Sequence, residues 1–198
     1  MEQYIINKLP NILKLNINIK TLKYISYDNS NNEHLTHSKK TAIDFDSVKN
    51  LYNIKDNNNI FELQSNDALY IDKNKIHYFI EFKNIQIIKN KPRKIKKELQ
   101  LKIYDSIFIL SDIEYSNGIK YISDIFSFSK NYIIYILVYN SNKNSSLQIH
   151  NNLENKSKML SDKLGLSKFT KFLLKEVYIY DEEEFEREFI NKIIRNEP

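Results

Sequence analysis

The strongest constraint on the fold is a continuous apolar run at residues 131–139. After Asn131 the run reads Tyr-Ile-Ile-Tyr-Ile-Leu-Val-Tyr, without polar alternation. A strand whose side chains are apolar on both sides must be covered on both of its faces. This run therefore predicts the centre of a sheet flanked by helices, which is an α/β fold.

Composition excludes several classes of protein. The chain has 198 residues, 41% hydrophobic and 13% aromatic, which indicates one folded domain rather than a disordered chain. Cysteine is absent, so there is no disulfide, thiolate zinc site or cysteine nucleophile. Only two glycines occur, too few for a Walker or dinucleotide-binding loop. No apolar run reaches about 18 residues and no secretory signal is visible, so we expect a cytoplasmic protein without a membrane partner.

The order of the predicted elements supports a mixed central sheet. We divide the single domain into an N-terminal extension (1–43), a core (44–139), and C-terminal helices with an edge strand (140–198). In the core, local patterns predict a helix at 44–53, strands at 60–64, 67–72 and 76–85, a helix at 93–112 and a strand at 131–139. Beyond it we expect helices at 153–164 and 166–174 with Gly165 as a C-cap, a strand at 176–180, and a final helix N-capped by Asp181.

The predicted helix at 93–112 carries two apolar stripes. One consists of residues repeating mostly at i+4: Ile95, Leu99, Ile103, Ile107 and Leu110. The other consists of Leu101, Tyr104 and Phe108. A helix that is apolar on more than one side is typical of a buried position, so we expect this helix to lie between layers.

The sharpest chemical feature is the segment Glu81-Phe82-Lys83 with Asp67 upstream. Glu81 and Lys83 are two residues apart on a predicted strand, so their side chains share a face. A three-residue loop at 73–75 would pair Asp72 with Ile76 and set Asp67 opposite Glu81. A two-residue loop would turn Asp67 to the other face, because a slip of one residue inverts every side chain.

Two carboxylates placed side by side favour a cation between them. Mg²⁺ or Mn²⁺ binds oxygen ligands and often uses only one or two carboxylates. An adjacent lysine can orient a water molecule and stabilise charge on phosphorus. The alternative is an amphipathic strand with Glu81 and Lys83 in solvent. Because the same face would carry Leu69, Ile71 and Phe79, we expect it to be covered instead.

These residues resemble the PD-(D/E)xK nuclease superfamily, whose core is αβββαβ. The resemblance spans roughly residues 44–139 and implies that Asp67, Glu81 and the main-chain carbonyl of Phe82 bind the metal, with Lys83 as the catalytic lysine. It departs from the family pattern at Asn66, where a proline would stand, and Asp72 competes with Asp67 for the first acidic position.

A second part of the resemblance lies in the helix that follows. Gln100-Leu101-Lys102-Ile103-Tyr104 is similar to the Q-x-x-x-Y motif of RecB-like members. By that resemblance Gln100 and Tyr104 would flank the site.

The segment 89–102 is strongly basic. It holds the candidate nucleic-acid-binding residues Lys89, Lys91, Arg93, Lys94, Lys97 and Lys102, with a single acid, Glu98. Such a segment would attract a phosphate backbone, although a solvated helix start in a lysine-rich chain has the same composition.

Two functions follow as hypotheses. The first is a Mg²⁺- or Mn²⁺-dependent nuclease that hydrolyses phosphodiester bonds in DNA or RNA, a role suited to conflict between phage and host. The second is a catalytically inactive protein on the same scaffold, such as an inhibitor or immunity protein. It would bind a partner protein through the basic helix or the acidic C-terminal helix.

Overall fold

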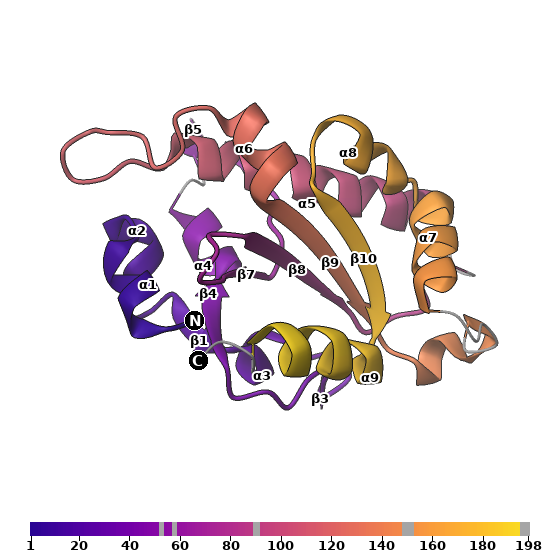
Figure 1. Cartoon of the computed structure of the whole chain (residues 1–198). Helices are drawn as coiled ribbons and strands as arrows, with labels where there is room; N and C mark the ends of the chain where they lie inside the picture. Colours follow the sequence, from indigo (N-terminus) through magenta and orange to yellow (C-terminus); the bar gives the residue numbers. More distant parts are fainter. Residues whose placement is uncertain (52–53, 57–58, 89–91, 148–152, 195–198) are drawn as a thin grey trace.

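A six-stranded mixed sheet forms the centre of the computed structural model, which describes residues 1–51, 54–56, 59–88, 92–147 and 153–194. The strands lie in the order β1 (Ile19–Thr21), β4 (Thr41–Asp44), β7 (Ala68–Ile71), β8 (His77–Lys83), β9 (Ile133–Tyr139) and β10 (Glu176–Asp181). Strands β8, β9 and β10 run parallel to one another, whereas β1, β4, β7 and β8 pair antiparallel. The predicted α/β class with a mixed sheet and flanking helices is confirmed (Figure 1).

The remaining elements surround this sheet. The helices are α1 (Gln3–Lys8), α2 (Asn11–Lys14), α3 (Leu22–Ile25), α4 (Phe45–Asn50), α5 (Pro92–Asp112), α6 (Ile125–Tyr132), η1 (Asn142–Leu147), α7 (Leu153–Leu164), α8 (Ser167–Phe172), α9 (Glu182–Glu184) and η2 (Phe185–Ile194). Two small hairpins pair β2 (Tyr27–Asp28) with β3 (Glu33–His34) and β5 (Ile54–Asp56) with β6 (Asn59–Phe61).

The first predicted core strand, at residues 60–64, is not part of the central sheet. Residues 59–61 pair with β5 in a separate hairpin, and β4 lies next to β7. The side chains of Ala42 and Ile43 are fully buried in the two opposite apolar layers, so β4 supplies apolar contacts on both sheet faces. The core therefore runs β4-α4-β7-β8-α5-β9, and part of the predicted N-terminal extension belongs to the sheet.

Both faces of the sheet are covered. One face packs against α1, α2, α4, α5, α7 and α8, with Leu69, Phe79, Tyr135 and Leu137 pointing into this layer. The opposite face packs against α3 and η2 through residues that include Leu22, Phe185 and Phe189. In Figure 1, α5, α7 and α8 lie above and to the right of the strands, and α9 with η2 lies below. Complete cover explains why β9 is buried along its whole length.

Helix α5 lies on one face of the sheet, not between two layers. The stripe Ile95, Leu99, Ile103, Ile107 and Leu110 is buried as predicted. The second stripe is exposed, with 48% of Leu101, 45% of Tyr104 and 58% of Phe108 accessible. The expectation of a fully buried helix was wrong, because among the described residues no further layer covers this side of α5.

The predicted helices near the C-terminus are present, with α7 at the predicted bounds and α8 shorter than the predicted 166–174. Gly165 has φ +65° and separates α7 from α8, a backbone conformation that glycine adopts without steric cost. Asp181 caps α9 in a capping box with Glu184. Lys156 of α7 is buried and pairs with both acids, its Nζ lying 3.1 Å from Asp181 Oδ2. No helix in the described part of the chain is both long and apolar enough to cross a bilayer.

His77, at the start of β8, is buried in neutral form. Its Nδ1 lies 2.8 Å from the Lys75 carbonyl and its Nε2 lies 2.8 Å from the Tyr121 hydroxyl. Burial lowers the pKa of His77 to about 4, opposed by its contact with Lys75. The folded protein therefore resists protonating this ring, while the unfolded chain protonates it near pH 6.5.

We expect this difference to make the protein less stable in mild acid. Above pH 6.5 the ring is neutral in the folded and unfolded states. The contribution of neutral His77 to the free energy of unfolding is lost as the pH falls from about 6.5 to about 4. The loss is about 3 kcal/mol, at about 1.4 kcal/mol per pKa unit. Urea unfolding across this range should show a flatter pH profile for His77→Gln than for wild type. Equal slopes for the two proteins would contradict the prediction.

Candidate functional site

The pairing of β7 with β8 brings Asp67 and Glu81 together. Ala68 pairs with Ile80 and Ile71 with His77, and the Asp72 amide donates to the Ile76 carbonyl at 3.1 Å. This is the register of the three-residue loop, which sets Asp67 opposite Glu81. The register that the sequence required for Asp67 and Glu81 to share one site is therefore present.

Two lysines join the carboxylates in one cluster. Lys102 Nζ, from α5, lies 3.2 Å from Asp67 Oδ1 and 2.7 Å from Glu81 Oε1. Lys83 Nζ lies 2.8 Å from the same Glu81 oxygen and 2.6 Å from Glu98 Oε1. We call Asp67, Glu81, Lys83, Glu98 and Lys102 the charged cluster.

The cluster lies beneath α5, where charge is costly unless it is compensated. The side chain of Glu81 is 0% exposed and that of Lys102 is 13% exposed. Burial opposes ionisation of Glu81, but Lys83 and Lys102 outweigh burial, so the pKa of Glu81 is lowered. Burial and the neighbouring Glu81 raise the pKa of Asp67 to about 7, against the effect of the two lysines. The pKa values of both lysines are raised because Glu81 and Asp67 outweigh their burial.

The backbone fixes Asp67 and leaves one oxygen of Glu81 free. The Phe82 amide donates to Asp67 Oδ2 at 2.6 Å, while the Phe82 ring packs on Phe185 on the opposite side of the sheet. Glu81 Oε2 is buried and has no hydrogen-bond partner. An unpartnered carboxylate oxygen beside a second carboxylate is a donor set that fits a small divalent cation.

The donor set consists of two carboxylates. Among the residues that the structure describes, no group of three or more His, Cys, Asp or Glu side chains is arranged to hold a metal. A cation here would need ligands from outside the side chains, such as water and substrate oxygens, as Mg²⁺ commonly has. The Phe82 carbonyl remains a predicted ligand.

Asp72, the competing first acid, has a structural role. Its Oδ1 accepts from the amides of Asn74 at 2.9 Å and Ile76 at 2.8 Å, and its Oδ2 accepts from the Tyr78 hydroxyl at 3.3 Å. These bonds hold the turn between β7 and β8. Asp67 is therefore the acid that reaches Glu81.

Gln100 and Tyr104 face away from the charged cluster. The Gln100 amide donates to the Gly165 carbonyl at 3.1 Å and accepts from Lys168 at 3.2 Å. The Tyr104 ring packs against Phe169 of α8 at 5.2 Å between centroids. Both predicted flanking residues thus contact the α7–α8 region, because the helix turns them to a different side from Lys102.

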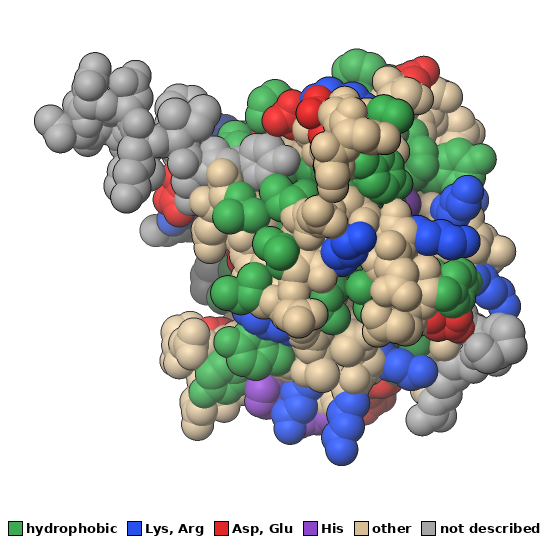
Figure 2. Space-filling view, turned by 90° about the vertical axis from the view of Figure 1, so that its left-hand side faces the viewer, with side chains coloured by type: hydrophobic (Ala, Val, Ile, Leu, Met, Phe, Trp, Pro, Cys, Tyr) green, Lys and Arg blue, Asp and Glu red, His purple; other side chains and the backbone are tan. Residues whose placement is uncertain are grey.

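The basic residues of the predicted nucleic-acid interface separate into three groups. Lys89 and Lys91 lie outside the described residues. Arg93, Lys94 and Lys97 are exposed on the first turns of α5, whereas Lys102 lies in the charged cluster. On the face at the left of Figure 1, lysine and arginine side chains are dispersed over the surface rather than collected in one patch (Figure 2).

A hollow of about 450 Å³ lies next to the charged cluster. Its lining includes Asn84 directly after β8, Glu98 and Lys94 of α5, and Lys143 of η1. Lys143 Nζ donates to the Asn84 carbonyl at 2.9 Å. The hollow is therefore lined by Glu98 at the edge of the charged cluster and by the side chains of Lys94 and Lys143.

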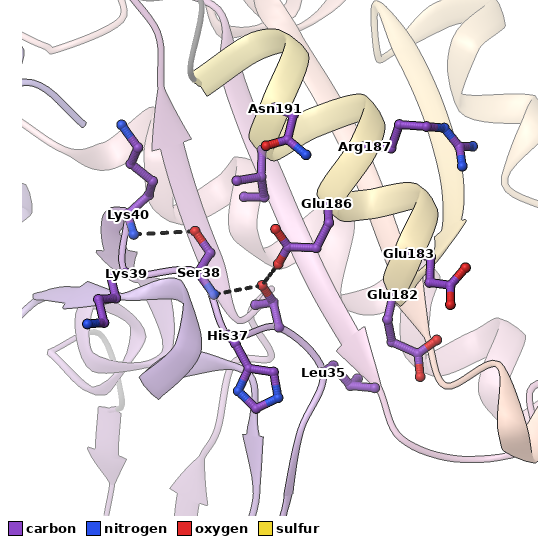
Figure 3. Close-up of a pocket in the computed structure, with 12 residues that line it drawn as sticks. Leu35, His37, Ser38, Lys39, Lys40, Glu182, Glu183, Glu186, Arg187 and Asn191 are labelled. Carbon is purple, nitrogen blue, oxygen red and sulfur yellow. Dashed lines mark hydrogen bonds between the residues drawn. The ribbon is translucent and has the colours of Figure 1, made fainter.

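A second, larger hollow of about 770 Å³ lies between residues 35–40 and the α9–η2 segment. Glu186 accepts a hydrogen bond from Thr36 across it, and the other charged side chains on its walls carry both signs (Figure 3). Lys39 and Lys40 stand on one wall, and Glu182 and Glu183 on the other (Figure 3). Because its charges are mixed, this groove does not present a uniform acidic surface to a basic partner.

Sequence reasoning missed that Glu98 and Lys102 belong to the site. The two residues were read only as part of a basic segment. They are four residues apart on α5, next to the buried positions Leu99 and Ile103, so they share a side of the helix close to the sheet. That spacing after a Glu-x-Lys strand is the signal that could have identified them.

The comparisons with known proteins gave no match: no family model, no curated protein and no solved structure is similar to this chain.

Proposed function

We propose that this protein is a Mg²⁺- or Mn²⁺-dependent nuclease of the PD-(D/E)xK type. The observation that supports it is the convergence of Asp67, Glu81 and Lys83 beneath α5, with one oxygen of Glu81 buried and unpartnered. Buried charges without a structural requirement are costly, and here they occur as the combination that phosphodiester hydrolysis uses.

Each residue has a defined part in the proposed reaction. Asp67 and Glu81 would hold the cation, which supplies a polarised phosphoryl oxygen and an activated water. The Phe82 amide keeps Asp67 in place through its 2.6 Å hydrogen bond. Lys83 would orient the attacking water and stabilise charge developing on phosphorus, and Glu98 fixes the lysine from its other side.

Lys102 would act as a stand-in for the cation in the metal-free protein. Its ammonium contacts both carboxylates and so neutralises them when no metal is bound. A divalent ion that binds Asp67 and Glu81 has to displace it. The partial exposure of Lys102 and its flexible side chain allow that movement.

The same contact favours one alternative function. If Lys102 holds the carboxylates permanently, the site is an internal ion pair and the protein is an inactive member of the scaffold that binds a partner. Incubation of plasmid DNA, single-stranded DNA and RNA with the protein in Mg²⁺ or Mn²⁺ separates the two. Cleavage that EDTA abolishes supports the nuclease, and intact substrates in all conditions support the inactive binding protein.

The hollow beside Glu98 is the proposed approach for the phosphate backbone. Lys94 lines it, and Arg93 and Lys97 are exposed on the same turns of α5. The chain carries a net charge of +5, which also favours a polyanion.

We expect a triple variant with glutamine at Arg93, Lys94 and Lys97 to bind nucleic acid more weakly. The slope of log K against log salt is negative, and each lost phosphate contact to duplex DNA reduces its magnitude by about 0.9. The magnitude of the slope should therefore be smaller by about 2–3 in the variant. Fluorescence anisotropy in a salt series, with EDTA to prevent cleavage, measures this change.

A control variant carries the same number of changes on other surfaces, at Lys8, Lys120 and Lys171, which are also exposed. It should retain most of the slope. Equal losses in the two triple variants would show that net charge, rather than the start of α5, governs binding.

A further inference from the structure

Among the described residues, the buried hydroxyls of two tyrosines on β9 accept or donate no hydrogen bond. Both Tyr135 and Tyr139 belong to the layer under α5, and the accessible area of each hydroxyl oxygen is below 1 Å². A buried hydroxyl without a partner is unfavourable by about 1–3 kcal/mol. Each such group in a folded protein therefore requires an explanation.

The register of β8 and β9 places Tyr135 beside Glu81. Tyr135 pairs with Phe79 and Leu137 pairs with Glu81, so Tyr135 and Glu81 are diagonal neighbours. Alternation along each strand turns both side chains to the face under α5. Glu81 Oε2 is itself buried and unpartnered, so two unsatisfied polar atoms occupy the same part of this layer.

The electrostatic surroundings separate the two tyrosines. After burial, the largest influence on Tyr135 is the charge of Glu81, followed by Asp67 and Glu98, and all of them raise its pKa. For Tyr139, burial raises the pKa, the neighbouring Lys156 lowers it, and Asp181 and Glu184 raise it. Lys156 Nζ lies 5.7 Å from the centre of the Tyr139 ring. Tyr135 thus faces the charged cluster, and Tyr139 faces the ion pairs of α7.

We infer that Tyr135 is a positioning residue of the charged cluster, whose hydroxyl holds the free oxygen of Glu81 through one buried water molecule. Buried waters typically lie between polar groups that have no other partner, and the two atoms would supply two of the two to four contacts that such a water makes. The lysines fix Glu81 Oε1, so the tyrosine fixes the second oxygen and with it the orientation of the carboxylate. This inference deepens the proposed function, because Glu81 is its main metal ligand.

A double-mutant cycle tests the interaction without any metal. Urea unfolding is measured for the full chain with Tyr135→Phe, Glu81→Gln and both changes together. Tyr135→Phe should lower the unfolding midpoint in the otherwise native chain, and the shift should be at least halved when Glu81→Gln is already present. Tyr139→Phe is the matched control, because it removes a buried hydroxyl from the same face of the same strand. Its shift should be the same with and without Glu81→Gln.

Two results would overturn the inference. One is an unchanged or raised midpoint for Tyr135→Phe, which is expected if the hydroxyl contacts nothing. The other is an equal shift for Tyr135→Phe in both backgrounds. If Glu81→Gln does not fold, Glu81→Asp, which withdraws the carboxylate by one methylene, replaces it in the same cycle.

Titration with Mn²⁺ by calorimetry distinguishes failure of this inference from failure of the proposed function. If the double-mutant cycle shows coupling but wild type does not bind Mn²⁺, the tyrosine contact is supported and the nuclease proposal is refuted. If wild type binds Mn²⁺ but the cycle shows no coupling, the tyrosine contact is refuted and the nuclease proposal stands. Where both hold, Tyr135→Phe should weaken Mn²⁺ binding about 10-fold and Tyr139→Phe should not, as for groups that orient metal ligands. Equal Mn²⁺ affinity in the two tyrosine variants would overturn the positioning role.

Discussion

Glu81→Gln should abolish metal-dependent cleavage while leaving the protein folded. The substitution keeps the shape of the side chain and removes the charge that would bind the cation. We expect activity in Mg²⁺ to fall by at least about 10²-fold, the range found when a group that stabilises a transition state is removed. Plasmid nicking and release of labelled oligonucleotides measure the loss.

The fold should survive because each lysine keeps another acid. Lys83 retains Glu98 at 2.6 Å, and Lys102 retains Asp67 at 3.2 Å. Circular dichroism and urea unfolding should therefore show a cooperative native state. Glu188→Gln makes the same chemical change in a surface pair with Lys192 and should cleave like wild type.

Lys83→Ala provides an independent arm of the same experiment. It should reduce cleavage by a similar factor but leave Mn²⁺ binding intact, since Asp67 and Glu81 are unchanged. Lys120→Ala, which removes an exposed lysine paired with Asp112 and Glu114, is the matched control. Wild-type cleavage by both Glu81→Gln and Lys83→Ala would refute the nuclease.

Lys102→Met should make the stability of the protein depend on divalent metal. Without Lys102, the hydrogen bonds and ion pairs left in the described part of the chain are the Phe82 amide for Asp67 and Lys83 for Glu81. Removing one partner of a buried ion pair costs about 3–5 kcal/mol. We expect a loss of about 3 kcal/mol in the free energy of unfolding, measured in EDTA at pH 8.

Mn²⁺ should then restore most of that loss. Ligand at 100 times its Kd adds about 2.7 kcal/mol to the stability of the folded state. The variant should also bind Mn²⁺ more tightly than wild type, because no ammonium has to be displaced. Lys97→Met, on an exposed turn of the same helix, should change neither quantity. A variant that stays destabilised at saturating Mn²⁺ would show that Lys102 completes a structural ion pair.

The sequence predicted the elements that lie deepest in the fold. The apolar run of β9 and the stripe from Ile95 to Leu110 can both be buried when helices pack on the faces of a sheet, so these two patterns together predict an α/β fold. These elements depend on neighbouring residues and on periodicity, both of which are visible in a single chain. The sequence also showed that a three-residue loop at 73–75 would set Asp67 opposite Glu81, but the structure decided between that loop and a two-residue one.

The sequence could not identify contacts between distant segments. It predicted a core strand at residues 60–64, whereas β4 occupies the place beside β7, because short strands with similar patterns compete for the same edge. It also placed Gln100 and Tyr104 at the site and overlooked Glu98 and Lys102. Which side of α5 faces the sheet near the cluster depends on how the helix packs across β8 and β9.

By itself, therefore, the sequence determined the α/β class and the central strand, since both follow from local hydrophobic periodicity. It named Asp67, Glu81 and Lys83 as candidates but left open the loop length on which their meeting depends. Only the tertiary structure decided which cation compensates the two carboxylates, which oxygen of Glu81 makes no hydrogen bond among the described residues, and that Tyr135 lies diagonal to Glu81 across β8 and β9. The physical reason is that charge compensation in a buried layer depends on side chains from other elements, and their separation along the chain does not fix their distance in space.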